Sequence, residues 1–189
     1  MRKILAACLL YLYTHCSITC CNHLHWSCLA LPSNTLRSIL FNMRASAYMK
    51  IAMTEATSSS GEIPVGAVVV HNGVIIAKAH NLTIQNTDPT AHAEIVAIRM
   101  ACKALSTHIL DGCDIYVTLE PCAMCTQAIS LARIRRIYFG AYNEKLGGIE
   151  TGAQVLKYCL HVPEVYGGFL EQENAKLLKA FFKKMRLKK

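Results

Sequence analysis

Apolar and polar positions alternate with distinct periods along most of the chain. Residues 44–57 carry apolar side chains at helical spacing, which predicts a helix that ends at the following run of serines and a glycine. Residues 65–70 and 74–80 are nearly continuous apolar runs joined by Asn72-Gly73, a pattern typical of a tight type I′ hairpin. Because both runs are apolar throughout, we expect both strands to be covered on both faces.

The remainder of this region continues to alternate between helical and strand patterns. In chain order, the pattern predicts a helix over 91–105, a strand over 115–119, a helix over 122–132, a strand over 136–140, a loop over 142–152, a short strand over 165–170 and an amphipathic helix over 171–187. The order α-β-β-α-β-α-β-β-α predicts an α/β fold in which a mixed sheet lies between helix layers.

Composition limits the class of protein further. The chain has 189 residues, of which 53% are hydrophobic, enough for one domain with some extra sequence. Its formal net charge of +8 is compatible with a polyanionic partner without identifying one. Five of the ten cysteines lie in the first 28 residues, and among the others only Cys122 and Cys125 have metal-ligand spacing. Scattered single cysteines favour a reducing compartment over a disulfide framework.

Residues 1–42 differ from the rest of the chain in composition. They contain no acidic residue, and Arg2 and Lys3 precede the apolar run Ile4–Tyr13. That start resembles a secretory signal, and the lack of acids is also typical of a transit peptide. No small-x-small cleavage site follows, and the run is too short to cross a membrane as a helix.

Three interpretations of this segment stay open: a start codon placed too far upstream, a targeting segment, or a genuine extension. Met43 and Met49 stand just before the first predicted helix, and either could begin a complete domain. We therefore expect residues 1–42 to lie outside the fold and residues 43–189 to form the domain.

Residues with metal and proton chemistry gather in two stretches of the domain, His92-Ala93-Glu94 and Pro121-Cys122-Ala123-Met124-Cys125. Cys122 and Cys125 are three residues apart and so share a helical face, and Pro121 suits a first helical turn. His92, Cys122 and Cys125 would supply three zinc ligands. Three protein ligands leave a fourth position for water, as in catalytic rather than structural zinc sites.

Glu94 is separated from His92 by one residue, which places it away from the ligand direction and free to carry protons. Simpler interpretations exist for each part. Cys-x-x-Cys alone also occurs in redox pairs and in structural zinc sites, and His92 alone could be a core histidine. A structural zinc would need a fourth ligand, for which four histidines are available: His71, His80, His108 and His161.

The pattern H-x-E…P-C-x-x-C is typical of zinc-dependent nucleobase deaminases. With its flanking residues it resembles the bacterial-type tRNA-specific adenosine deaminase family over about residues 44–187. The segments that carry the resemblance are Ile63–Val68, Asp88–Glu94, Tyr116–Cys125 and Phe139–Ala141. The resemblance implies a cytidine-deaminase-like three-layer α/β/α fold with a mixed five-stranded sheet and one zinc ion per subunit. It also implies a cytoplasmic homodimer. The implied reaction is hydrolysis of the wobble adenosine of a tRNA, usually an arginine tRNA, to inosine.

The resemblance also implies roles for individual residues. His92, Cys122 and Cys125 would bind zinc and Glu94 would shuttle protons. Three further residues would contact the substrate: Asn81 the flipped nucleotide of the anticodon stem-loop, Val65 the face of the base, and the backbone N–H of Ala93 the purine edge. On spacing alone, Val65 is equally well explained as ordinary strand core.

Two basic clusters could face RNA or could be ordinary solvated surface. The C-terminal segment has seven basic residues against one acid from Glu173 onward: Lys176, Lys179, Lys183, Lys184, Arg186, Lys188 and Lys189. Arg133, Arg135 and Arg136 form the second cluster. In the loop between them, Asn143 stands where the family often has aspartate, which affects the expected RNA contacts but not the zinc chemistry.

Two other functions compete with tRNA deamination. One is deamination of a free nucleobase, guanine or cytosine, by an enzyme of the same superfamily. The other is a non-catalytic, zinc-stabilised tRNA-binding subunit. The basic C-terminal helix argues against the first, and the presence of Glu94 argues against the second.

Overall fold

The computed structural model describes residues 33–58 and 61–187. The signal-like run at the N-terminus and the last two lysines lie outside these residues. The elements are α2 (Ser33–Ser58), β1 (Gly66–His71), β2 (Val74–His80), α3 (Ala93–Leu105), β3 (Cys113–Leu119), α4 (Ala123–Leu131), β4 (Arg136–Ala141), the 3-10 helix η1 (Val155–Tyr158), β5 (Glu164–Tyr166) and α5 (Glu171–Arg186).

The five strands form one mixed sheet in the order β2-β1-β3-β4-β5. β1 pairs antiparallel with both β2 and β3, whereas β3, β4 and β5 run parallel. The hairpin between β1 and β2 turns at Asn72 and Gly73, both of which have positive φ, as the sequence predicts. The mixed five-stranded sheet is therefore confirmed.

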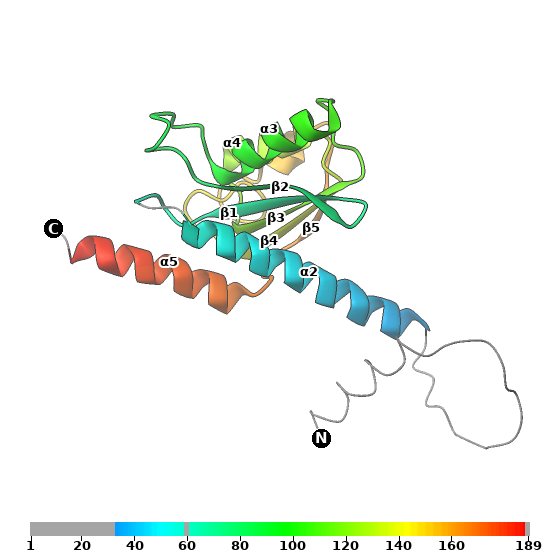
Figure 1. Cartoon of the computed structure of the whole chain (residues 1–189), viewed down its shortest axis with the longest axis horizontal. Coiled ribbons are helices and arrows are strands. Elements are labelled where there is room, and N and C mark those ends of the chain that lie inside the picture. The colour runs from blue at the N-terminus through cyan, green and yellow to red at the C-terminus, as the bar shows by residue number, and fades with distance from the viewer. Residues whose placement is uncertain (1–32, 59–60, 188–189) are drawn as a thin grey trace, which may run out of the picture. The chain divides into compact units, whose positions relative to one another are not determined.

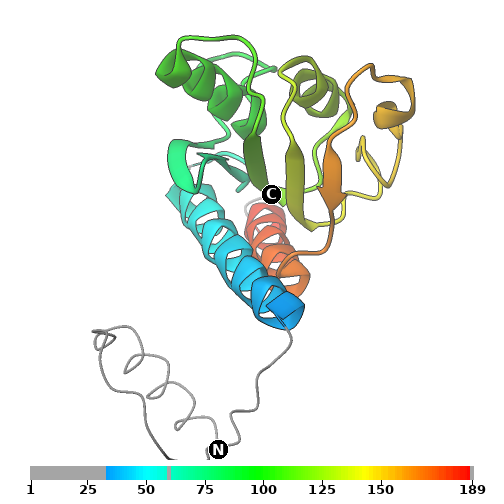
Figure 2. The ribbon, with the colours of Figure 1, turned by 90° about the vertical axis from the view of Figure 1, so that its right-hand side faces the viewer.

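Helices cover both faces of the sheet, so the domain has three layers (Figures 1 and 2). On one face, Ala97 and Ala101 of α3 and Ile129 of α4 pack with the inward side chains of β1, β3 and β4. On the other face, α2 supplies Ala45, Met49 and Ala52 to a second core cluster. α5 lies beside α2 below the sheet (Figure 2). Coverage on both faces explains the buried apolar run of β1, whereas the edge strand β2 is only partly covered, with Val74 and Lys78 exposed.

Two elements differ from the predicted bounds by more than two residues. The first helix begins at Ser33 instead of 44, and within this upstream extension Phe41 packs on Tyr138 and Tyr166 of the sheet. The last strand ends at Tyr166 instead of 170, because Gly168 has a φ of +75° and turns the chain away from the sheet. The short 3-10 helix η1 was not predicted.

The parallel strands define two ends of the sheet. Glu120, Pro121 and Cys122 directly follow the carboxyl end of β3, whereas Asp114 lies near its amino end. None of the described helices has both the length and the hydropathy needed to cross a membrane.

Candidate active site

His92, Cys122 and Cys125 meet at the amino-terminal ends of α3 and α4. His92 is the N-cap residue of α3 and Cys122 is the N-cap residue of α4, and neither side chain makes a capping hydrogen bond. Nδ1 of His92 lies 3.6 Å from Sγ of Cys122 and 3.5 Å from Sγ of Cys125. The two helix starts therefore converge on one point, as predicted from the sequence.

This geometry fits a zinc ion. Zinc bonds of about 2.3 Å to sulfur and about 2.0–2.1 Å to nitrogen, at tetrahedral angles, place the nitrogen and each sulfur about 3.6 Å apart. The three ligand atoms all lie within 4.8 Å of one another. His92 and Cys122 are half-buried while Cys125 is fully buried, so the centre is open on one side. That opening is where a substrate would approach.

The two cysteine thiols of the cluster differ in acidity. Hydrogen bonding from Cys125 lowers the pKa of the Cys122 thiol, and its contact with His92 acts in the same direction. The same bond, together with burial, raises the pKa of Cys125. The N-terminal ends of both helices point their positive dipole ends at the sulfur atoms, which favours thiolates there.

Glu94 lies in the first turn of α3 and is 4% exposed. It is not among the three residues whose ligand atoms cluster. Burial, opposed by hydrogen bonding and by the positive charge of His92, raises the pKa of Glu94 to about 7. A buried carboxyl beside the centre but outside its ligand set is suited to hold and transfer a proton.

The structure brings Asn81, Ala93 and Val65, the residue before β1, together beside the centre. Oδ1 of Asn81 accepts the backbone N–H of Ala93 at 2.9 Å, and its Nδ2 donates to the carbonyl of Ile63 at 3.0 Å. The Ala93 N–H is thus already donated, and it can reach a purine only by sharing or releasing this bond. Val65 is 6% exposed and belongs to the core cluster under α3.

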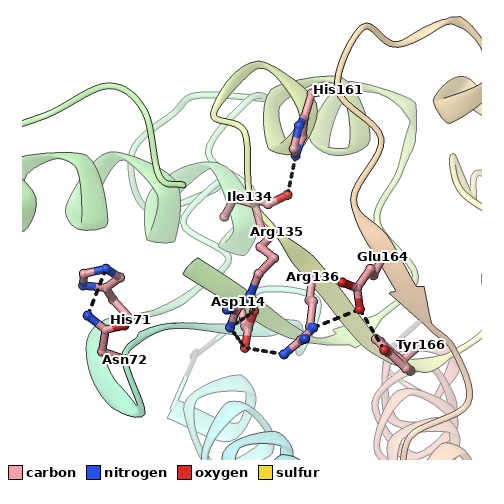
Figure 3. Close-up of polar contacts among 9 residues, drawn as sticks. All are labelled: His71, Asn72, Asp114, Ile134, Arg135, Arg136, His161, Glu164 and Tyr166. Atoms are coloured by element: carbon pink, nitrogen blue, oxygen red, sulfur yellow. Dashed lines mark hydrogen bonds and ion pairs between the residues drawn. The ribbon is translucent and has the colours of Figure 1, made fainter. Parts of the chain in front are cut away.

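No fourth metal ligand joins the cluster from residues 33–58 or 61–187. His161 bonds the carbonyl of Ile134 through Nε2 at 2.7 Å, and His71 lies beside Asn72 at the hairpin (Figure 3). His80 is outside the cluster too. The arrangement therefore favours an open, catalytic site over a closed, structural one.

The arginine cluster of the sequence is neutralised and lies away from the site. Arg135 forms two hydrogen bonds with Asp114, both at 2.9 Å, and Arg136 donates to Glu164 at 3.0 Å (Figure 3). Asp114 precedes the carboxyl end of β3 by five residues, or about 17 Å of strand. This cluster is therefore an ion-pair network at the opposite end of the sheet.

The basic residues of α5 behave differently. Lys176, Lys179, Lys183 and Lys184 are exposed, and none of them forms an ion pair within the described part of the chain. An apolar groove of about 870 Å³ runs beside this helix, lined by Ile63, Ile84, Phe181, Phe182, Met185 and Arg186 among others. Ile63 connects the groove to the site, because its carbonyl accepts the hydrogen bond from Asn81.

Sequence reasoning missed Glu120, which directly precedes the zinc-ligand turn. Its side chain is 1% exposed and accepts hydrogen bonds from the loop that follows β4. Burial alone would raise the pKa of Glu120, but the hydrogen bonds from Thr151, Asn143 and Glu150 outweigh it and lower the pKa. Its position after a buried strand was the available signal.

A three-layer α/β/α domain with three zinc ligands and a separate buried carboxylate defines a zinc-dependent deaminase. The family described as "Cytidine and deoxycytidylate deaminase zinc-binding region" matches residues 43–141. The chain belongs to this family, and His92, Cys122 and Cys125 are positioned to bind its zinc ion.

Similar proteins in this family are named tRNA-specific adenosine deaminase. The chain is 49% identical over 144 residues to the tRNA-specific adenosine deaminase of Agrobacterium fabrum, covering 74% of this chain and 95% of that protein. It is 47% identical over 146 residues to the protein of the same name from Bacillus subtilis, covering 75% and 91% of the two chains. A solved structure from a study of A-to-I editing by tRNA:A34 deaminases aligns with a TM-score of 0.69 at 49% identity, covering 70% of this chain and 99% of that one.

Proposed function

We propose that this protein hydrolyses adenosine to inosine at the wobble position of a tRNA, with release of ammonia, and that an arginine tRNA is its substrate. The observation that carries the chemistry is the buried, non-ligand carboxyl of Glu94 beside a three-ligand centre. The similarity to tRNA-specific adenosine deaminases over nearly their whole length supports the choice of substrate.

The zinc ligands and Glu94 would have separate roles in the hydrolysis. When held by His92, Cys122 and Cys125, zinc would supply Lewis acidity that lowers the pKa of a water molecule. The carboxylate of Glu94 accepts a proton as that water attacks the carbon bearing the amine, and delivers it to a ring nitrogen. Glu94 then takes the proton of the newly formed hydroxyl group and passes it to the leaving amine, so one water is consumed and one ammonia is released.

The residues around the centre suit an extruded purine. One hydrogen of the Asn81 Nδ2 group is donated to Ile63, which leaves the second for the nucleotide. Val65 would contact the base from its position just before β1, and the Ala93 N–H would bind the purine edge when Asn81 shares it. An anticodon loop presents unpaired bases, so extrusion costs less than from a duplex.

Support for an RNA substrate comes from α5. Its exposed lysines offer phosphate contacts, and the exposed side chain of Phe182 lines the groove beside them. Aromatic side chains next to a basic surface stack unpaired bases. The ion-paired Arg135 and Arg136 are excluded from this role by their partners.

A substrate panel tests the proposal. The wild-type protein should convert adenosine to inosine in an arginine-tRNA anticodon stem-loop. It should not deaminate free guanine or free cytosine. Glu94→Gln should reduce the rate by about 10³-fold while the protein retains one zinc per chain, because only proton transfer is lost. Inosine is measured by mass spectrometry of nucleosides, and zinc by elemental analysis.

Glu164→Gln is the matched control, since Glu164 is paired with Arg136 at the far end of the sheet. It should keep wild-type activity. Activity on free guanine or cytosine with none on RNA would instead assign the protein to the small-molecule deaminases. RNA binding without any deamination would assign it to non-catalytic tRNA-binding subunits.

We also propose that the protein acts as a homodimer in the cytoplasm, where tRNA is available. Four exposed apolar side chains near α4 and η1 support self-association: Leu131, Tyr158, Leu160 and Val162. Leu131, Tyr158 and Leu160 line one groove, so they form a continuous surface.

A further inference from the structure

The buried carboxylate of Glu120 gathers the loop between β4 and η1 around itself. Its Oε1 accepts the backbone N–H groups of Ile149, Glu150 and Thr151 at 3.2, 2.8 and 2.9 Å. Its Oε2 accepts the N–H of Asn143 at 3.1 Å and the hydroxyl of Thr151 at 2.6 Å. Both ends of the loop are therefore tied to a single side chain.

The same loop rests against the turn that carries the zinc ligand Cys122. The N–H of Gly148 donates to the carbonyl of Pro121 at 2.8 Å, and Gly147 forms a bridge with Cys122. A Cβ at Gly148 would lie 2.8 Å from the backbone of Ala123, so the two segments are in direct contact. Loop and metal-ligand turn are thus packed together without an intervening layer.

The charge of Glu120 is compensated by this loop. Within residues 33–58 and 61–187, no lysine, arginine or histidine forms an ion pair with it. A buried carboxylate without a cation depends on converging N–H and O–H donors, and those donors all come from residues 143–151. Glu120 is two residues from Cys122, so a loop that closes on the carboxylate also fixes the ligand's backbone.

We propose that Glu120 is a positioning residue that holds the loop 142–152 and the Cys122 turn as one unit. It touches neither metal nor substrate, and acts by keeping Cys122 in place and one wall of the site closed. Its consequence for catalysis rests on the proposed function, whereas its consequence for zinc retention does not.

Zinc release and amide exchange test this directly in the full-length, zinc-loaded protein. Glu120→Gln keeps the shape of the side chain but removes its charge and one acceptor oxygen. It should speed zinc transfer to the chelator 4-(2-pyridylazo)resorcinol by about tenfold, at the low end of effects from residues supporting metal ligands. Hydrogen exchange of the amides of residues 149–151 should accelerate by a similar factor.

Glu62→Gln is the matched control. Glu62 is also buried, at 3% exposed, and also holds a loop through Thr83, Ile84 and Gln85, but within the described residues no backbone hydrogen bond joins that loop to the Cys122 turn. It should leave zinc release and exchange at residues 149–151 unchanged. Thr151→Val, which removes one hydroxyl donor to Glu120, should give a smaller change in the same direction as Glu120→Gln.

Equal zinc release from wild type, Glu120→Gln and Thr151→Val would overturn the proposal. The same acceleration in Glu62→Gln would also overturn it, by showing that any lost buried carboxylate loosens the site. Neither measurement uses RNA, so a failure of tRNA deamination leaves this test intact.

Discussion

Glu62 holds the loop after β2 in the way that Glu120 holds the loop after β4. It accepts the hydroxyl of Thr83 at 2.7 Å and the N–H groups of Ile84 and Gln85 at 2.7 and 3.1 Å. Burial raises the pKa of Glu62, but these hydrogen bonds outweigh it, and the pKa is lowered overall. The ionised form is therefore the one that stabilises the fold.

This predicts an acid-sensitive contribution to stability. Because the pKa of Glu62 is lower in the folded chain, its contribution is complete above the unfolded-state pKa of about 4.3 and is lost as the pH falls through the folded-state value. Glu62→Gln should lower the free energy of unfolding by about 2 kcal/mol at pH 7 and by clearly less at pH 3. Urea denaturation at both pH values measures the difference, and an equal loss at pH 3 would contradict the role of the charge.

At the scale of residues, the sequence predicts the ligands but not their supports. His92, Cys122 and Cys125 are recognisable because zinc requires particular side chains at helical spacing. Glu62 and Glu120 cannot be recognised in this way, because an acidic residue next to a strand has the same sequence pattern whether its side chain is buried or solvated. Their burial depends on loops that are 20 to 30 residues away in the chain.

At the scale of elements, helix α2 extends further upstream than its sequence suggests. Phe41 lies on the tyrosines that stack across the parallel strands, with ring centroids 6.0 Å from both Tyr138 and Tyr166. The guanidinium of Arg136 sits 5.8 Å from the same ring. Phe41, which precedes the predicted start of this helix, is therefore in contact with the sheet.

Phe41→Ala should lower the free energy of unfolding by about 1–2 kcal/mol. This is less than the loss of about 3–5 kcal/mol for a fully buried phenylalanine, because the ring is 36% exposed. Met43→Ala, at a side chain 63% exposed on the same helix, should change stability by less than about 0.5 kcal/mol. Denaturant unfolding compares the two, and equal effects would show that Phe41 does not pack on the sheet.

The other elements show why bounds are harder to predict than the elements themselves. The hairpin strand β2 has its predicted bounds, 74–80, because Asn72-Gly73 fixes where the turn must lie. The prediction for β5 runs four residues too far, because apolar residues continue past the end of the strand at Tyr166. Phe169 and Leu170 pack against the core cluster beneath α2 instead of pairing in the sheet. Hydrophobicity alone does not distinguish these two ways of being buried.

At the scale of the whole molecule, charge and apolar surface occupy different regions. The net charge of +8 is not concentrated on the arginine cluster, because those side chains form ion pairs. It is not concentrated on the sheet either, because helices cover the sheet. The lysines of α5 are exposed beside an apolar groove. This separation leaves one surface suited to RNA and another, near α4 and η1, suited to a protein partner.

The apolar surface at Leu131, Tyr158, Leu160 and Val162 predicts the oligomeric state. These side chains are 69%, 85%, 108% and 60% exposed, which is unfavourable for a surface that always faces water. We expect light scattering to give twice the chain mass of 20.9 kDa for the wild type. The paired change Leu131→Lys with Leu160→Lys should weaken association at least about 100-fold and leave a monomer, because charges cannot be buried unpaired at the centre of an interface.

Val74→Lys is the control for this prediction, since Val74 is 63% exposed in the edge strand β2 and does not line the groove formed by Leu131, Tyr158 and Leu160. It should keep the mass of a dimer while changing the net charge in the same direction. A wild-type monomer at micromolar concentrations would contradict the homodimer. A dimer that survives both lysines would place its interface elsewhere on the domain, because a patch carrying two unpaired positive charges cannot stay desolvated against a second copy of itself.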